Sequence, residues 1–139
     1  MIQWKYLKNS KSFQNKLEVQ KPKNTALKRF DVWIADLNPR MGTEPGKTRP
    51  VVIVQTDLLN NLHPSTIICP ITTNIIPGAE VMRVTLSKNE AGLKTRSAIL
   101  VDQIRVIDNR RLVKRTGAIN EDSRIRLADN LKIIMDIEI

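Results

Sequence analysis

The sequence holds a single histidine, His63, and a single cysteine, Cys69, among its 139 residues. Mechanisms that move protons between two histidines are therefore excluded within one chain. One cysteine can neither form an internal disulfide nor assemble a zinc site, and Cys69 stands in the apolar run IICPI, so we expect a buried apolar residue. His63 follows two asparagines and precedes a proline, which predicts a surface loop with no role as a base or ligand.

Long hydrophobic runs and metal-binding motifs are also missing. No apolar run approaches the roughly 18 residues needed to cross a bilayer, and the N-terminus lacks the apolar segment of a secretory signal. We therefore expect a cytoplasmic protein with no membrane association. The sequence has no H-E-x-x-H motif, no clustered carboxylates and no G-x-S-x-G turn, so we expect no metal and no other cofactor.

The net charge of +9 is concentrated at the N-terminus. Residues 1–29 hold seven lysines and one arginine against one glutamate, a net charge of +7 that leaves +2 for the remainder. Trp4, Tyr6 and Phe13 are interleaved with these lysines. Such a segment suits nucleic-acid binding by stacking and phosphate neutralisation, and it equally suits an amphipathic helix on the globular part. We therefore divide the chain into a basic extension at 1–28, helical within residues 2–20, and one domain at 29–139.

From residue 30 onward, short apolar runs alternate with turn residues, which predicts a small all-β barrel. The expected strands lie at 31–37, 50–55, 66–73, 81–86 and 97–106, followed by a helical turn at 110–112 and an extended piece at 113–119. Asn120 is the expected N-cap of a C-terminal helix, because Glu121 and Asp122 follow it. Its expected apolar stripe consists of Ile125, Ala128, Leu131, Ile134 and Met135.

The stretch GTEPGKTRPVVIV at residues 42–54 superficially resembles a phosphate-binding loop. Only three residues separate Gly42 from Gly46, whereas a Walker A loop requires four. The lysine of such a loop also opens a helix, and here a β-branched strand follows. We therefore do not expect a nucleotide-binding loop, and this stretch needs another explanation.

The polar residues around the second and third expected strands offer one. Arg49 carries a planar fork of donors suited to a phosphate, Glu44 could accept a proton, and Thr72 or Thr73 could hold a phosphate oxygen. Neighbouring strands would bring these side chains together. The residue types alone leave two interpretations open, because an Arg–Glu pair is often structural and threonines on strands often serve packing.

Several motifs in a common order resemble one family, the MazF/PemK toxins of bacterial toxin-antitoxin systems. The matching stretches are FDVWIADLNP at 30–39, GTE at 42–44, RPVVIV at 49–54, IT at 71–72 and LVDQIR at 100–105. The resemblance covers roughly residues 29–137. It implies a dimeric, SH3-like β-barrel with a C-terminal helix that cleaves single-stranded RNA at short preferred sequences without a metal.

The resemblance also implies roles for individual residues. Arg49 and Thr72 would stabilise the transition state while a 2′-hydroxyl attacks the adjacent phosphorus, and Glu44 would accept a proton or orient Arg49. The expected RNA contacts are Thr43, Lys47, Thr73 and Gln103. A cognate antitoxin is the expected protein partner. The alternative is a non-catalytic nucleic-acid-binding protein or a gyrase-poisoning toxin of related fold, although the Arg-Pro and Ile-Thr pairs favour the nuclease.

Overall fold

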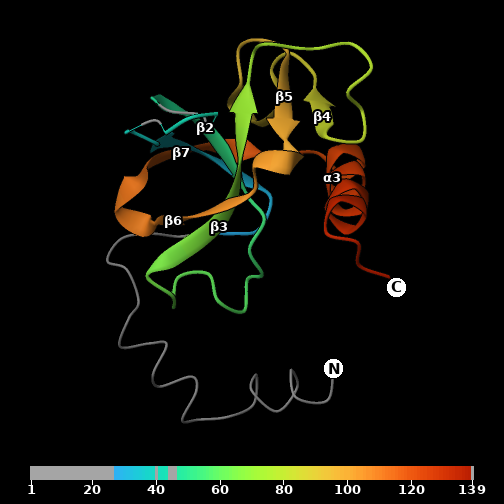
Figure 1. Ribbon diagram of the computed structural model, residues 1–139. Helices are drawn as coiled ribbons and strands as arrows, with labels where there is room; N and C mark the ends of the chain where they lie inside the picture. The colour runs from blue at the N-terminus through green and yellow to red at the C-terminus, as the bar shows by residue number, and fades with distance from the viewer. Residues whose placement is uncertain (1–26, 40, 44–46, 139) are drawn as a thin grey trace.

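The computed structural model describes residues 27–39, 41–43 and 47–138 (Figure 1). The helix and the aromatic contacts expected within the basic extension lie outside these residues. The described chain contains seven strands, three short 3₁₀ helices (η) and one α-helix. Their order is β1 (Asp31–Asp36), β2 (Thr48–Ile53), β3 (Ser65–Thr72), β4 (Arg83–Leu86), η1 (Glu90–Gly92), β5 (Ser97–Leu100), η2 (Val101–Gln103), β6 (Arg105–Asp108), η3 (Asn109–Arg111), β7 (Leu112–Ala118) and α3 (Glu121–Ile134).

All strand pairs are antiparallel, and the strands follow the order β4-β5-β3-β2-β1-β7 with β6 also paired to β3. Figure 1 shows β3 running through the middle of the molecule, with β5 beside its upper end and β6 beside its lower end. The expected fold class, mainly β with a C-terminal helix and SH3-like, is confirmed. The sheet path ends at β4 and β7, so among the described strands the sheet stays open and does not close into a barrel.

The single strand expected at 97–106 is wrong, because the chain forms β5 and β6 with η2 between them. Ile71 of β3 pairs with Ile99, whereas Ile68, three residues earlier, pairs with Arg105, six residues later. A continuous antiparallel partner would advance by only three residues, so η2 absorbs the three extra. The sequence pattern missed this break because the segment 97–106 contains neither the glycine nor the proline that would mark it.

Apolar side chains alternate between the two faces of the sheet, as the period of a strand requires. On β2, Val52 belongs to a core cluster that also contains Cys69 and Leu127, whereas Val51 and Ile53 belong to a second cluster on the other face. The second cluster also contains Trp33 of β1 and Leu37, the residue that follows β1. All of these residues are buried. With both faces packed, β2 and β3 are rigid platforms for the residues at their ends.

Helix α3 begins as expected, since the Asn120 side chain accepts a hydrogen bond of 2.9 Å from the amide of Ser123. The apolar stripe is only partly right. Leu131 and Ile134 pack against the core, but Ile125 and Met135 are each 54% exposed, and the apolar residue of the helix that is fully buried is Leu127. The contacts of α3 with β4 and η2 set its rotation, which the helical period alone does not determine. No helix in the described ranges has the length and apolar content needed to cross a bilayer.

The rotation of α3 predicts unequal costs for two apolar truncations. Leu127→Ala should lower the free energy of unfolding by about 2–5 kcal/mol because it leaves a cavity in the core. Ile125→Ala, the matched control two residues away, should change it by no more than about 0.5 kcal/mol. Urea denaturation followed by circular dichroism measures both, and equal losses would contradict the observed rotation.

Candidate active site

The pairing of β2 with β3 places the two main candidate residues side by side. Val51 pairs with Pro70 and Val52 with Cys69, and continuing this register by two residues sets Arg49 opposite Thr72. Residues that lie opposite each other in an antiparallel pair point to the same face of the sheet. The two side chains therefore share one face, although 23 positions of sequence separate them.

Small residues flank this pair on the adjoining strands. Arg49 pairs with Ala35 of β1, and Thr72 pairs with Ala98 of β5. Both alanines are buried, Ala35 in the second core cluster and Ala98 beneath the pocket on β4 and β5 described below. In the row that runs across β1, β2, β3 and β5, the side chains of Arg49 and Thr72 therefore lie between two alanines.

A pocket of about 170 Å³ opens at this position, which we call the Arg49 pocket. It is lined by Arg49, Pro50, Ile71, Thr72, Thr73 and Ser97. Arg49 and Thr72 are half-buried and Thr73 is exposed, so the pocket is open to solvent while its floor is the packed sheet. The structure thus brings together three of the residues selected from the sequence.

The hydroxyl of Thr72 has a defined orientation. Its Oγ1 accepts a hydrogen bond of 3.1 Å from the backbone amide of Asn74, as in a turn that a threonine side chain closes. Because a hydroxyl carries one proton and two lone pairs, the O–H remains available as a donor. Beside a guanidinium, this arrangement suits a ligand that presents several acceptor oxygens, such as a phosphodiester.

The other residues expected at the site do not line the Arg49 pocket in the part of the chain that the structure describes. Thr43 and Lys47 are exposed in the segment between β1 and β2, whereas Glu44 lies outside the described residues. Gln103 was expected on a strand bordering the site, and this is wrong, because it is half-buried in η2. Since η2 packs against α3, β3 and β4, Gln103 is not among the described residues that line the Arg49 pocket.

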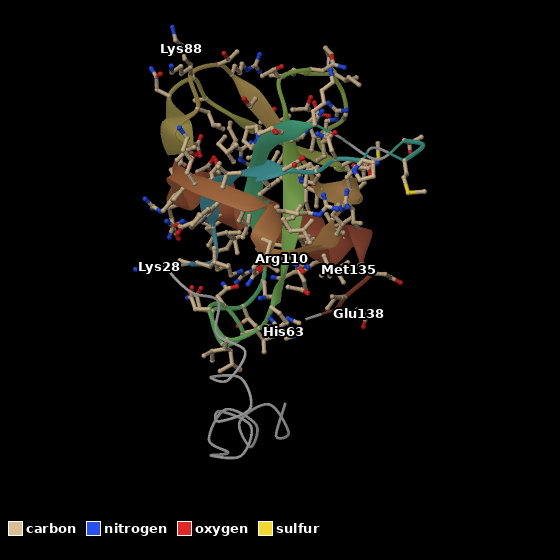
Figure 2. All side chains as sticks on the ribbon, turned by 90° about the vertical axis from the view of Figure 1, so that its left-hand side faces the viewer. Lys28, His63, Lys88, Arg110, Met135 and Glu138 are labelled. Carbon is tan, nitrogen blue, oxygen red and sulfur yellow. The ribbon has the colours of Figure 1, made fainter. Side chains whose placement is uncertain are left out.

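Neither His63 nor Cys69 is placed to act in the pocket. His63 lies before the start of β3, nine residues from Thr72, which corresponds to about 30 Å along an extended strand. Figure 2 shows it at the end of the molecule opposite Lys88. His63 is half-buried, with Nδ1 3.2 Å from both the amide nitrogen and the carbonyl oxygen of Ser65. Cys69 is fully buried in the core, as expected.

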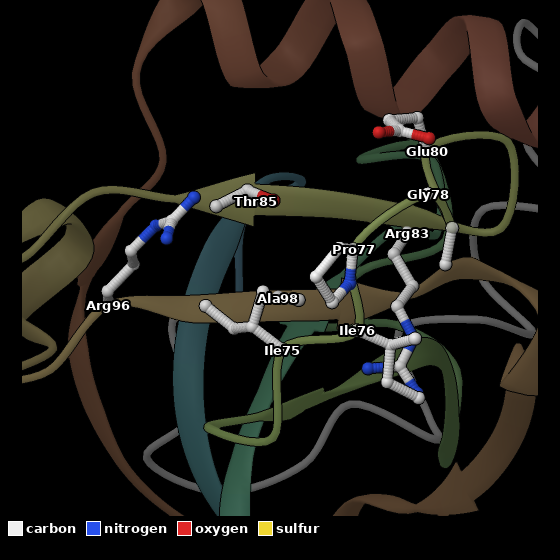
Figure 3. Close-up of a pocket in the computed structure, with 10 residues that line it drawn as sticks. Ile75, Ile76, Pro77, Gly78, Glu80, Arg83, Thr85, Arg96 and Ala98 are labelled. Atoms are coloured by element: carbon white, nitrogen blue, oxygen red, sulfur yellow. The ribbon is translucent and has the colours of Figure 1, made fainter.

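A second pocket of about 280 Å³, the Arg83 pocket, lies on β4 and β5. It is lined by Ile75, Ile76, Pro77, Gly78, Ala79, Glu80, Arg83, Thr85, Arg96 and Ala98. Figure 3 shows Arg83 and Arg96 at opposite ends, with Pro77 and Ala98 between them. Ala98 is the β5 residue that pairs with Thr72, so the two pockets adjoin along the sheet.

The sequence prediction missed Arg83 and Arg96. In the strand RVTL, Arg83 and Thr85 alternate with buried Val84 and Leu86, so the period of two could have assigned Arg83 to the outer face. The guanidinium of Arg83 also donates a hydrogen bond of 2.6 Å to the carbonyl oxygen of Asn74, two residues after Thr72. Arg96 has no comparable signal, because it lies in a turn rich in polar residues.

Comparisons with known proteins agree with this geometry. Residues 28–135 match the family model described as the PemK-like, MazF-like toxin of type II toxin-antitoxin systems. Endoribonuclease MazF of Staphylococcus epidermidis is 35% identical over 111 residues, which cover 80% of this chain and 92% of that protein. Endoribonuclease EndoA of Bacillus subtilis is 34% identical over 107 residues, which cover 77% of this chain and 92% of that protein.

A solved structure supports the fold independently. An endoribonuclease in complex with its cognate antitoxin, from a mycobacterial species, superimposes with a TM-score of 0.68. The match covers 82% of this chain and 99% of that one at 15% sequence identity. At this identity the likeness concerns the fold.

The burial of Cys69 predicts an unreactive thiol. Burial, assisted by the nearby carboxylate of Asp102, raises the pKa of the Cys69 thiol to about 12. The reactive thiolate is therefore scarce at pH 8. Iodoacetamide should leave the folded protein unmodified at pH 8 and label it rapidly in denaturant, as measured by intact mass. Rapid labelling of the folded protein would contradict the burial.

Proposed function

The chain belongs to the PemK-like, MazF-like toxin family of type II toxin-antitoxin systems, and on this basis we propose that it is an endoribonuclease that cleaves single-stranded RNA at short preferred sequences. The observation that carries the proposal is the shared pocket of Arg49 and Thr72. Both relatives described above are named endoribonucleases, and they cover most of this chain. The alternative is a protein that binds nucleic acid without cleaving it.

In the proposed reaction, a ribose 2′-hydroxyl attacks the adjacent phosphorus. The new O–P bond closes a 2′,3′-cyclic phosphate while the bond to the 5′-oxygen of the next nucleotide breaks, leaving a 5′-hydroxyl. The proton lost from the 2′-oxygen is balanced by the proton gained by the 5′-oxygen. No metal ion takes part in this scheme, and no water is consumed.

Arg49 and Thr72 have complementary tasks in this reaction. The guanidinium of Arg49 stabilises the negative charge that grows on the non-bridging phosphate oxygens, because it is a cation with a planar fork of donors. The O–H of Thr72, oriented by the amide of Asn74, donates to one of these oxygens. Glu44 is proposed as the proton acceptor or as an orienting partner of Arg49.

The RNA strand is proposed to continue from the Arg49 pocket into the Arg83 pocket. Ala98 pairs with Thr72, which makes the two pockets neighbours on one face. Arg83 and Arg96 supply positive charge at the ends of the second pocket, while Ile75 and Pro77 supply an apolar wall. Cations beside apolar surface suit the phosphates and bases of a single strand. Thr43, Lys47 and Thr73 are proposed as further contacts, and Gln103 is placed less favourably.

The proposed setting is a cytoplasmic homodimer that a cognate antitoxin holds inactive. The mycobacterial endoribonuclease described above is reported in complex with its antitoxin. An antitoxin that covers the two pockets would have to present acidic groups to Arg49, Arg83 and Arg96. The molar mass measured by sedimentation equilibrium tests whether the chain is a dimer. Addition of the antitoxin should suppress cleavage of RNA, which tests the proposed partner.

We expect the purified protein to cleave a long single-stranded RNA in the presence of EDTA. Arg49→Ala should lower kcat about 10²- to 10³-fold, because one preorganised donor to a developing oxyanion is lost. Thr72→Val, which removes only the hydroxyl, should lower it by at least about tenfold. Gel analysis of a labelled RNA measures the rates, and treatment of the fragments with phosphatase and kinase identifies their ends.

One control variant sharpens the test. His63→Ala removes the lone histidine, which lies nine residues before Thr72 at the other end of β3, so this variant should cleave at the wild-type rate. Binding of RNA without cleavage by any form would favour the non-catalytic alternative. Loss of activity in EDTA would contradict the metal-free scheme, and 3′-hydroxyl ends would contradict attack by the 2′-oxygen.

The division at residues 28 and 29 is a prediction that a shortened chain can test. Leu27 is 1% exposed, and its amide and carbonyl both bond to the Asn61 side chain at 2.6 and 2.8 Å, so the shortened chain should begin at Ala26 to keep this anchor. We expect it to cleave RNA. If the basic extension contacts phosphates, the slope of log Kd against log salt should become flatter, as fluorescence anisotropy measures. An unchanged slope would favour the amphipathic-helix interpretation.

A further inference from the structure

The chain between β1 and β2 is held at its base by a set of hydrogen bonds. The amide of Leu37 donates to the carbonyl oxygen of Lys47 at 3.0 Å, which extends the β1–β2 ladder by one step. The side-chain oxygen of Asn38 then accepts from the amide of Lys47 at 2.8 Å. Lys47 adopts a left-handed conformation, with φ of 65°, which is strained for a residue with a side chain. Asn38 therefore fixes the point where the chain enters β2.

Arg111 reaches this base from a distant part of the sequence. It ends η3, and the next residue, Leu112, pairs with Ala35 of β1. Its Nη1 donates to the carbonyl oxygen of Asp36 at 3.0 Å and to that of Asn38. One guanidinium thus binds the backbone on both sides of Leu37, and it is half-buried while doing so.

These bonds connect Arg111 to the Arg49 pocket in three steps. Arg111 holds the backbone of Asn38, the Asn38 side chain holds the amide of Lys47, and Lys47 precedes Arg49 by two residues. Asp36 itself pairs with Thr48, so both strands leave the base in a defined register. A shift of the base would move the backbone that carries Arg49. Displacements of about 1 Å at a reacting group can reduce a rate by about 10²-fold.

We propose that Arg111 is a positioning residue, which sets the entry of β2 and thereby the placement of Arg49 opposite Thr72. This inference rests on the proposed nuclease function. Arg111 is not among the described residues that line the Arg49 pocket or the Arg83 pocket. Its bonds to exposed carbonyls contribute little to overall stability, so its loss should disturb the site without unfolding the protein.

Arg110 provides a matched control for this proposal. It carries the same charge on the same 3₁₀ helix, but its guanidinium bonds to Asp108, at 3.0 Å through both Nε and Nη2. It makes no described bond to the β1–β2 base. A contribution of positive charge to RNA attraction would be lost in Arg110→Ala and Arg111→Ala alike, whereas a positioning role belongs to Arg111.

The first measurement is steady-state cleavage of a short RNA that contains one cut site. Arg111→Ala should lower kcat about 10- to 100-fold while KM changes less than about threefold, because the loss concerns placement rather than binding. Arg111→Lys should recover part of kcat, since its ammonium can still donate to these carbonyls although its side chain is shorter. Arg110→Ala should keep kcat and KM within about twofold of wild type.

The second measurement needs no RNA. Amide hydrogen exchange followed by NMR should show faster exchange at Leu37 and Lys47 in Arg111→Ala, and no change in Arg110→Ala. Unchanged exchange would overturn the proposal, as would a rise of KM alone with kcat retained. Failure of the wild-type protein to cleave RNA would instead overturn the nuclease function, and the exchange rates would still decide whether Arg111 holds the base.

Discussion

The antiparallel register between β2 and β3 is the constraint on which the rest of the molecule depends. It sets Arg49 and Thr72 opposite each other on one face, and a slip of one residue would send one of them to the other face. The register is held by burial on both faces of the sheet, since Val51 and Ile53 fill one core cluster while Val52 and Cys69 fill the other. Hydrophobic packing therefore determines the positions of the polar side chains of Arg49 and Thr72.

The neighbouring strands and the segment between β1 and β2 hold the ends of β3 and β2 in place. Strand β3 pairs with β2 along one edge as far as Pro70, and with β6 and then β5 along the other edge, where Thr72 pairs with Ala98. Its partner β2 begins at Thr48, directly after a chain segment whose base Asn38 and Arg111 hold. The candidate site thus combines a rigid strand end with an entry point that depends on a few polar contacts, as expected where catalytic residues stand at the margin of a scaffold.

The sequence pattern predicted most of the fold and part of the site. Alternating apolar residues located the first four strands, and Asn120 with its acidic neighbours located the start of α3. The break between β5 and β6 was missed, since a change of register leaves no mark in a segment that has neither glycine nor proline. The stripe of α3 was misassigned at Ile125 and Met135 for a related reason, because the helix is apolar on more than one side.

The sequence by itself determined the residue types, the ordered motifs around Asn38, Arg49 and Thr72, and therefore the family and the class of chemistry. The tertiary structure alone decided which of these residues meet. It joined Arg49 to Thr72, kept Gln103 away from their pocket and brought Arg111 to the carbonyl of Asn38. Local preferences act over a few residues, whereas these contacts arise from strand pairing between distant segments, and pairing is set by how the whole core packs.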